Sequence, residues 1–206
     1  KQGDAAAVAT YQKVCKTLDT MEHWLPENIR QFLEQFMSIS HLLDAKCKLL
    51  VEKLANVRWH VIPTDIRKNY VHMLEQLAVH YVSHTEVLLT CFTANFIPTL
   101  RHVIDTNTTS NEVEAGTSKE PIFEMVLDKL EQEGIYDMTH EAIKFVLRCF
   151  PMTVRLLEKS LRKNTPFVKA PLPRYEAFIR NLLIVHGYAF DIRDGIWKML
   201  LENLSQ

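Results

Sequence analysis

The sequence predicts an all-α fold, a HEAT-like helical-repeat superhelix (α-solenoid) with one disordered acidic and polar loop. Glycine accounts for only five of the 206 residues, and scarcity of glycine favours helix. Apolar residues recur at spacings of three and four, and no segment alternates convincingly with period two. The expected helices come in pairs joined by short corners at a spacing of very roughly 40 residues, as in HEAT repeats.

The first half of the chain contains five expected helices. Residues 4–20 are rich in alanine, and Pro26 marks the start of the next helix, where proline is well tolerated. Thr64 and Asp65 are expected to cap the fourth helix. The five expected ranges are 4–20, 27–43, 45–57, a helix from residue 64, and 86–96. The apolar face of the fourth helix is formed by Ile66, Tyr70, Leu74, Leu77, Ala78 and Tyr81.

The second half begins with a break in this pattern. Residues 105–120 are polar and poor in large apolar side chains, which predicts a flexible, disordered loop. An extended connector is expected over residues 164–173, because its three prolines forbid a continuous helix. The helices expected here are 121–133, 137–150, 151–163, 175–186 and 190–204.

Size and composition limit the classes of protein. A chain of 206 residues fits one helical-repeat unit over residues 1–206, and the start at Lys1 indicates a piece of a longer protein. The net charge of −1 gives no strong indication of direct nucleic-acid binding. No apolar run reaches the roughly 18 residues of a membrane span. The cysteines have no C-x-x-C spacing and are expected to be reduced and intracellular, and they are Cys15, Cys47, Cys91 and Cys149.

No sequence motif indicates catalysis or a cofactor. The chain has no G-x-S-x-G, no phosphate-binding loop and no dinucleotide fingerprint, so we expect neither an enzyme nor a cofactor site. His80 and His84 have the i, i+4 spacing of a metal pair, but a third ligand is missing. The simpler interpretation is two surface histidines, and no metal site is predicted. Trp24, Trp59 and Trp197 are expected to anchor the core or the stacking of repeats.

Charge is distributed unevenly along the chain. Residues 105–141 are strongly acidic, whereas residues 144–180 are strongly basic. Arg155, Lys159 and Arg162 follow i, i+4, i+7 spacing and therefore share one helix face. This face is either a solvated surface beside an acidic neighbour or a basic docking surface for an acidic partner or a phosphate backbone. The sequence leaves both interpretations open.

Two threonines are candidate phosphorylation sites. Thr153 follows Pro151 at the start of the basic helix, where its hydroxyl is expected to accept a bond from a first-turn N–H. A phosphate there would add up to two negative charges beside Arg155. The alternative role for Thr153 is that of a cap alone. Thr165 precedes Pro166 in the one Ser/Thr-Pro pair of the sequence.

Several motifs, in order along the chain, resemble one family. The closest match is the C-terminal run with Asn181-Leu182-Leu183, an expected corner at Gly187-Tyr188, and Ile196-Trp197. The other matching stretches are Trp59, Tyr70-x3-Leu74-x2-Leu77, Phe96-Ile97-Pro98 and the corner 148–153. Together they resemble the RNA polymerase I-specific transcription initiation factors of the TIF-IA type, and this chain is similar to their N-terminal part.

The resemblance implies a docking function in the nucleus and nucleolus. Members are HEAT-repeat superhelices that bind RNA polymerase I and bridge it to promoter-bound initiation factors on ribosomal DNA. A serine-rich surface contacts the polymerase and is regulated by phosphorylation. This chain has Ala78-Val79-His80 where relatives carry serines, with Ser83 nearby. The candidate partner-binding residues are Thr153, Arg155, Lys159, Arg162 and Ser83, and the candidate phosphorylation sites are Thr153 and Thr165.

Two other functions fit the same pattern of helices. One is another α-solenoid adaptor, such as a transport or RNA-associated scaffold. The other is a helical enzyme domain whose site leaves no mark on the sequence. A homodimer is also left open by the sequence.

Overall fold

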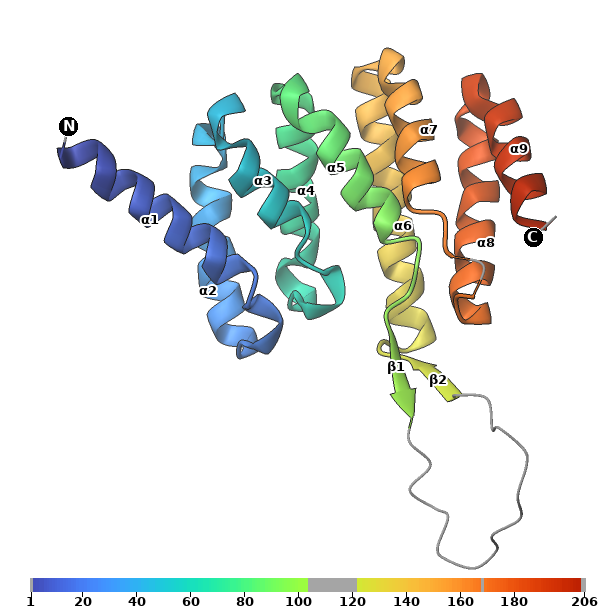
Figure 1. The fold of residues 1–206 in the computed structure, drawn as a ribbon, viewed down its shortest axis with the longest axis horizontal. Helices are drawn as coiled ribbons and strands as arrows, with labels where there is room; N and C mark the ends of the chain where they lie inside the picture. Colours follow the sequence, from blue (N-terminus) through green and yellow to red (C-terminus); the bar gives the residue numbers. More distant parts are fainter. Residues whose placement is uncertain (1, 104–121, 168, 205–206) are drawn as a thin grey trace, which may run out of the picture.

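The computed structural model describes residues 2–103, 122–167 and 169–204, which form a stack of helices with one small β-hairpin (Figure 1). The helices are α1 (Gln2–Leu18), α2 (Pro26–Ile39), α3 (Lys48–Ala55), α4 (Thr64–His80), α5 (Val82–Ala94), α6 (Lys129–Cys149), α7 (Val154–Lys163), α8 (Leu172–Tyr188) and α9 (Arg193–Leu204). The strands are β1 (Leu100–Val103) and β2 (Ile122–Met125). Short 3-10 turns lie at Met21–His23, Ser40–Leu42, Ala45–Cys47, Trp59–Val61, Pro151–Thr153 and Phe190–Ile192.

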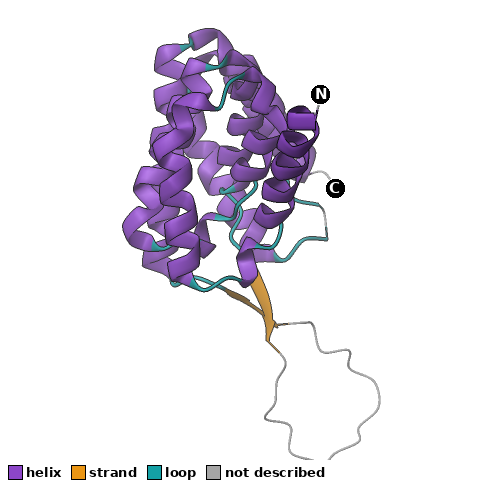
Figure 2. Ribbon diagram, turned by 90° about the vertical axis from the view of Figure 1, so that its left-hand side faces the viewer, coloured by secondary structure: helices purple, strands orange, loops and turns teal. Residues whose placement is uncertain are grey.

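The helices lie in two layers. The odd-numbered helices α1, α3, α5, α7 and α9 contact one another in succession, and so do the even-numbered helices α2, α4, α6 and α8 (Figures 1 and 2). Each helix therefore packs on the helix two positions away in its own layer, and the two layers contact each other through the pairs α4–α5, α5–α6 and α8–α9. This is the arrangement of stacked helical repeats. The predicted all-α helical-repeat fold is confirmed.

A continuous apolar core runs between the layers. Its largest buried side chains include Trp59, Tyr70, Phe92, Phe96 and Phe178. Trp59 packs its ring edge-on against Phe92, with 6.0 Å between ring centroids, so it anchors neighbouring repeats as expected. Trp197 is different, because it is 50 % exposed and meets only the ring of His186 among the described aromatic contacts.

A polar cluster joins α6 to α8 inside this core. The two ring nitrogens of His140 lie 3.0 Å from Tyr188 Oη and 3.0 Å from Asn181 Oδ1. Asn181 also donates to the carbonyl oxygens of Phe96 and Ala177. Burial lowers the pKa of His140, and the amide of Asn181 partly offsets this effect. The Asn181 motif of the sequence therefore fixes how α8 sits against α6 and the end of α5.

The expected helix over residues 121–133 is wrong. Residues Ile122–Met125 form strand β2, which pairs antiparallel with β1 from Leu100↔Met125 to Val103↔Ile122. The two strands are only four residues long, so period-two alternation has too few positions to appear in the sequence. The expectation that no strand exists is corrected accordingly. The predicted loop over 105–120 lies outside the described residues.

The helices expected at 121–133 and 137–150 are replaced by one helix. Helix α6 runs without interruption from Lys129 to Cys149 and passes through Gly134. Its N-cap is Asp128, whose carboxylate accepts a 2.8 Å hydrogen bond from the backbone N–H of Glu131. This Asp-x-x-Glu start lies inside the helix expected over 121–133, eight residues after its expected beginning, which is why the sequence pattern does not indicate it as a boundary.

Three other local expectations are corrected. Thr64 and Asp65 do not cap α4, because the N-cap residue is Pro63, and Asp65 instead pairs with Arg30 of α2. Gly187 and Tyr188 are the last residues of α8, so the chain turns at Ala189 and not at a Gly-Tyr corner. The connector is shorter than expected, because α8 begins at Leu172 with Pro171 as its N-cap.

Candidate functional site

The predicted basic face lies on α7 and is largely exposed. The side chain of Arg155 is 75 % exposed and contacts Glu158 at 3.5 Å. Lys159 donates to Glu86 of α5 at 2.6 Å. Arg162 contacts Glu158 at 3.3 Å and Glu202 of α9 at 3.4 Å. Each cation therefore has an acidic neighbour, and the weakly held Arg155 is the most available for a partner.

Ser83 belongs to the same surface. It lies exposed in the first turn of α5, three residues before Glu86. The hydrogen bond and charge of Lys159 lower the pKa of the Glu86 carboxyl, so this acid is ionised at neutral pH. The pair Lys159–Glu86 therefore brings Ser83 and the basic face of α7 together across two repeats.

Thr153 is placed differently from what the sequence predicts. Its side chain does not cap α7, because its hydroxyl donates 2.7 Å back to the carbonyl oxygen of Phe150. Hydroxyls at such corners satisfy a nearby backbone group in this way. The residue is only 9 % exposed. Phosphorylation of Thr153 stays a prediction, and it requires this hydroxyl to leave its site.

Thr165 lies directly after α7 and is half-buried. Its hydroxyl donates to the carbonyl oxygen of Leu161 at 3.2 Å, and the following Pro166 is buried. The neighbouring Asn164 donates to Thr90 O and Thr93 Oγ1 of α5. The chain around Thr165 is thus attached to α5, and phosphorylation of Thr165 also stays a prediction.

The two histidines at i, i+4 do not share a helix face. His80 ends α4, whereas His84 lies in α5 after a break at Tyr81. His80 is exposed, but His84 is buried with Nε2 2.9 Å from Asp44 O, so the interpretation of two surface histidines is wrong for His84. Within residues 2–103, 122–167 and 169–204, no group of three or more His, Cys, Asp or Glu side chains could hold a metal ion. None of the helices described is long and apolar enough to cross a membrane.

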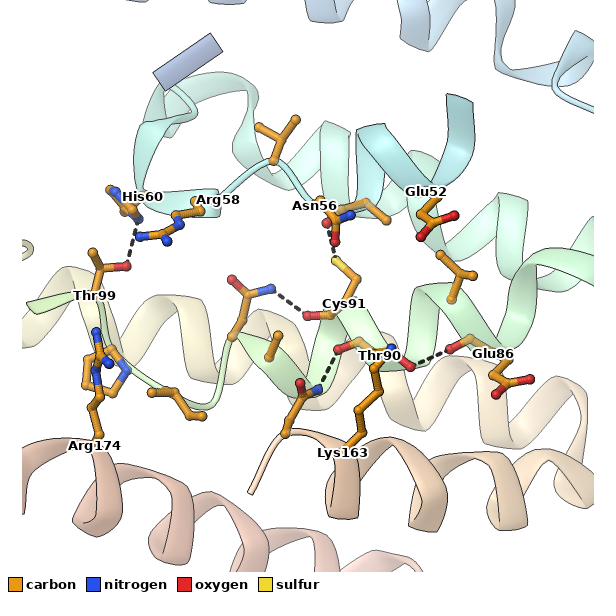
Figure 3. A pocket seen from close by; sticks show the side chains of 18 of the residues that line it. Glu52, Asn56, Arg58, His60, Glu86, Thr90, Cys91, Thr99, Lys163 and Arg174 are labelled. Atoms are coloured by element: carbon orange, nitrogen blue, oxygen red, sulfur yellow. Dashed lines mark hydrogen bonds between the residues drawn. The ribbon is translucent and has the colours of Figure 1, made fainter. Parts of the chain in front are cut away.

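A polar groove of about 680 Å³ lies along α5 and was not predicted (Figure 3). Helix α5 forms its floor, α3 and the loop after it form one wall, and the end of α7 with the start of α8 forms the other. No local sequence pattern marks it, because its residues come from stretches that lie up to 126 positions apart, from Lys48 to Arg174.

One end of the groove gathers cationic and polar side chains. Arg58, His60, Thr99 and Arg174 point toward one another there (Figure 3). His60 Nδ1 lies 3.2 Å from Thr99 Oγ1. Burial lowers the pKa of His60, and the nearby Arg58 and Arg67 lower it further. The end is therefore positively charged through its arginines, with a neutral imidazole between them.

Comparison with known proteins places the chain in a family. The sequence model of the family described as RNA polymerase I specific transcription initiation factor RRN3 matches residues 1–206. The chain is 27 % identical over 207 residues to the RNA polymerase I-specific transcription initiation factor tif-1A of Caenorhabditis elegans, covering 100 % of this chain and 30 % of that protein.

A solved structure shares the fold. The crystal structure of RNA polymerase I transcription initiation factor Rrn3 superposes with a TM-score of 0.59 at 16 % identity, covering 94 % of this chain and 39 % of that one. The chain thus spans about a third of the length of the relatives it matches. The match over all 206 residues shows that the chain belongs to the RRN3 family of RNA polymerase I specific transcription initiation factors.

Proposed function

We propose that this chain is a docking part of a factor that binds RNA polymerase I and joins it to promoter-bound factors for transcription of ribosomal RNA genes. It acts in the nucleus and nucleolus, by recognition and without catalysis. Family membership supports this function. The relative in C. elegans is named as a factor of the same kind.

The surface of α7 and the start of α5 is the proposed contact with the polymerase. The observation that supports this choice is the exposed Arg155, next to Lys159, which an ion pair connects to the Ser83 end of α5. Surface ion pairs contribute only ~0–1 kcal/mol, so Lys159 and Arg162 can exchange their acidic neighbours for those of a partner at little cost. The exposed Met152, at the adjoining corner, adds an apolar contact to this surface.

Ser83 is proposed as the site of regulation by phosphorylation, in preference to Thr153 and Thr165. Ser83 is exposed, whereas the hydroxyls of Thr153 and Thr165 both donate to backbone carbonyls. A phosphate on Ser83 would lie one helical turn from Glu86 and would attract Lys159 away from a partner.

Co-purification of RNA polymerase I with the tagged chain tests the proposal. Arg155→Glu with Lys159→Glu should reduce the recovered polymerase at least several-fold, because two cations become anions on the contact surface. The matched control is Lys144→Glu with Lys198→Glu, which makes the same change of charge on α6 and α9. Equal recovery with the two double variants would refute the α7 contact. Failure of the unaltered chain to bind any polymerase would refute the docking function of this part.

A further inference from the structure

We propose that the groove along α5 is a second interaction site, which binds an extended acidic peptide segment through Arg58 and Arg174. One end of this groove adjoins the proposed polymerase contact, because Ser83 and Glu86 line it, whereas Arg58 and Arg174 lie outside that contact. The site does not depend on polymerase binding, and its ligand is defined by the chemistry of the groove alone.

The arginine end of the groove lacks anionic partners. Within the described part of the chain, neither Arg58 nor Arg174 forms an ion pair. Among the described residues, Nε of Arg174 is buried and has no hydrogen-bond partner. A buried donor without a partner is uncommon in folded proteins. A carboxylate in the groove would neutralise the guanidinium charges at this end, and guanidinium groups bind carboxylates in bidentate fashion.

The other end of the groove is also cationic. Lys48 and Lys163 line it. The hydrogen bond and charge of Lys159 lower the pKa of Glu86, and the charges of Lys48 and Lys163 lower it further. Glu86 is paired with Lys159 through a 2.6 Å hydrogen bond, and among the described residues neither Lys48 nor Lys163 forms an ion pair. A ligand with acidic groups at both ends would therefore meet a cation at each.

The length of the floor fits an extended peptide. The distance along α5 from Glu86 to Ala94 is about 12 Å at 1.5 Å per residue. A strand-like segment rises about 3.3 Å per residue, so four residues cover this part of the floor. Apolar side chains, among them Val87 and Ala94, line the floor together with polar ones. A peptide with acidic residues at its ends and small apolar residues between them matches the length and the lining.

A nucleic-acid strand fits the groove less well. Glu52 and Glu86 both line it and would oppose a continuous chain of phosphates. A peptide can place uncharged residues beside these carboxylates, whereas a phosphodiester backbone has a charge at every step. The acidic peptide is therefore the occupant that the charges favour.

Fluorescence anisotropy with a labelled eight-residue peptide, which carries Glu at its two ends and Ala between them, measures the binding directly. Arg58→Gln with Arg174→Gln should weaken it by roughly tenfold or more, because charge-assisted hydrogen bonds are lost. The control is Arg101→Gln with Arg148→Gln, which removes the same two charges from β1 and α6, outside the groove. It should bind within about twofold of the unaltered chain, since only remote charges change.

Two more measurements separate a specific site from general attraction. The Nε–H resonance of Arg174, assigned by its loss in Arg174→Lys, should shift when the peptide binds. Arg58→Gln alone, at an exposed loop residue that leaves the core intact, should still weaken binding. The proposal is overturned if both double variants lose affinity equally, or if the peptide with Gln in place of Glu binds equally well. It is also overturned if an eight-nucleotide RNA binds the groove and the peptide does not.

Discussion

Arg67 of α4 and Glu131 of α6 form an ion pair of 2.9 Å across the even-numbered layer, and Arg67 is only 3 % exposed. The same guanidinium also donates to the carbonyl oxygen of Ile62 through Nε and Nη2. Arg67 thus joins the turn before α4, α4 itself and the first turn of α6. Without Arg67, the carboxylate of Glu131 and the carbonyl oxygen of Ile62 would lose a charged donor where the two repeats meet.

Replacing Arg67 should therefore lower the stability of the stack. Arg67→Met keeps the apolar length of the side chain and removes its donors. We expect a loss of about 2–3 kcal/mol in the free energy of unfolding, because the Glu131 carboxylate and the Ile62 carbonyl oxygen lose a charged donor. The loss is limited because Glu131 is partly exposed and can bind water instead. Urea denaturation measures the change. Lys68→Met, at the exposed neighbouring position, is the control and should change stability by less than about 0.5 kcal/mol.

Asn181 should matter more for stability than its small size indicates. Asn181→Ala leaves His140 Nε2 and the carbonyl oxygen of Phe96 without their partner inside the core. A loss of about 1–3 kcal/mol is expected for buried groups left unsatisfied. Asn69→Ala on the exposed face of α4 provides the comparison. Similar melting temperatures for the two variants would show that the cluster contributes nothing.

Stability should depend on pH through two histidines. Burial lowers the pKa of both His140 and His60, so the unfolded chain binds more protons than the folded one below about pH 6.5. The contribution of the two neutral histidines to the free energy of unfolding is therefore fully present above that pH, and it is lost as the pH falls below it. Urea midpoints at pH 7.5 and 5.5 test this. The difference in urea midpoint between the two pH values should be smaller in His140→Gln. It should stay unchanged in His41→Gln, which alters an exposed histidine.

Two glycines in helices should respond differently to replacement by alanine. Gly134 lies inside α6, and a Cβ there would meet no atom within 4 Å, so Gly134→Ala should stabilise the chain by about 0.5–1 kcal/mol. A Cβ on Gly195 would clash with Oε1 of Glu158. Glu158 would have to move away from Arg162, which offsets the gain in Gly195→Ala. Thermal unfolding of both variants measures the contrast, and equal gains would contradict it.

The helices could be predicted from sequence because their determinants are local. Ile66, Tyr70, Leu74 and Leu77 lie on one face by spacing alone, and all four are buried. Prolines likewise locate several helix starts, including Pro26 at the start of α2. Boundaries were less accurate, because 3-10 turns such as Ser40–Leu42 continue the same apolar pattern.

The features that were missed depend on contacts between distant residues. Strand β2 exists because Ile122 to Met125 pair with residues about 20 positions earlier, and neither strand is long enough to be recognised alone. Arg58 and Arg174 both line the groove, although they are too far apart in the sequence for any helix or strand spacing to predict it. Thr153 was expected to cap a helix from its position, but the structure assigns its hydroxyl to Phe150 O. The arginines and Ser83 of the proposed polymerase contact stay predictions.

The β-hairpin allows the number of residues between β1 and β2 to change without disturbing the stack of helices. Val103 and Ile122 are register partners, so these two residues lie one strand spacing apart, about 5 Å. Residues added or removed between them need not displace α5 or α6, since the cost of closing a loop rises only slowly with its length. The pairing of β1 with β2 therefore separates the number of residues between the two strands from the packing of the helices on either side.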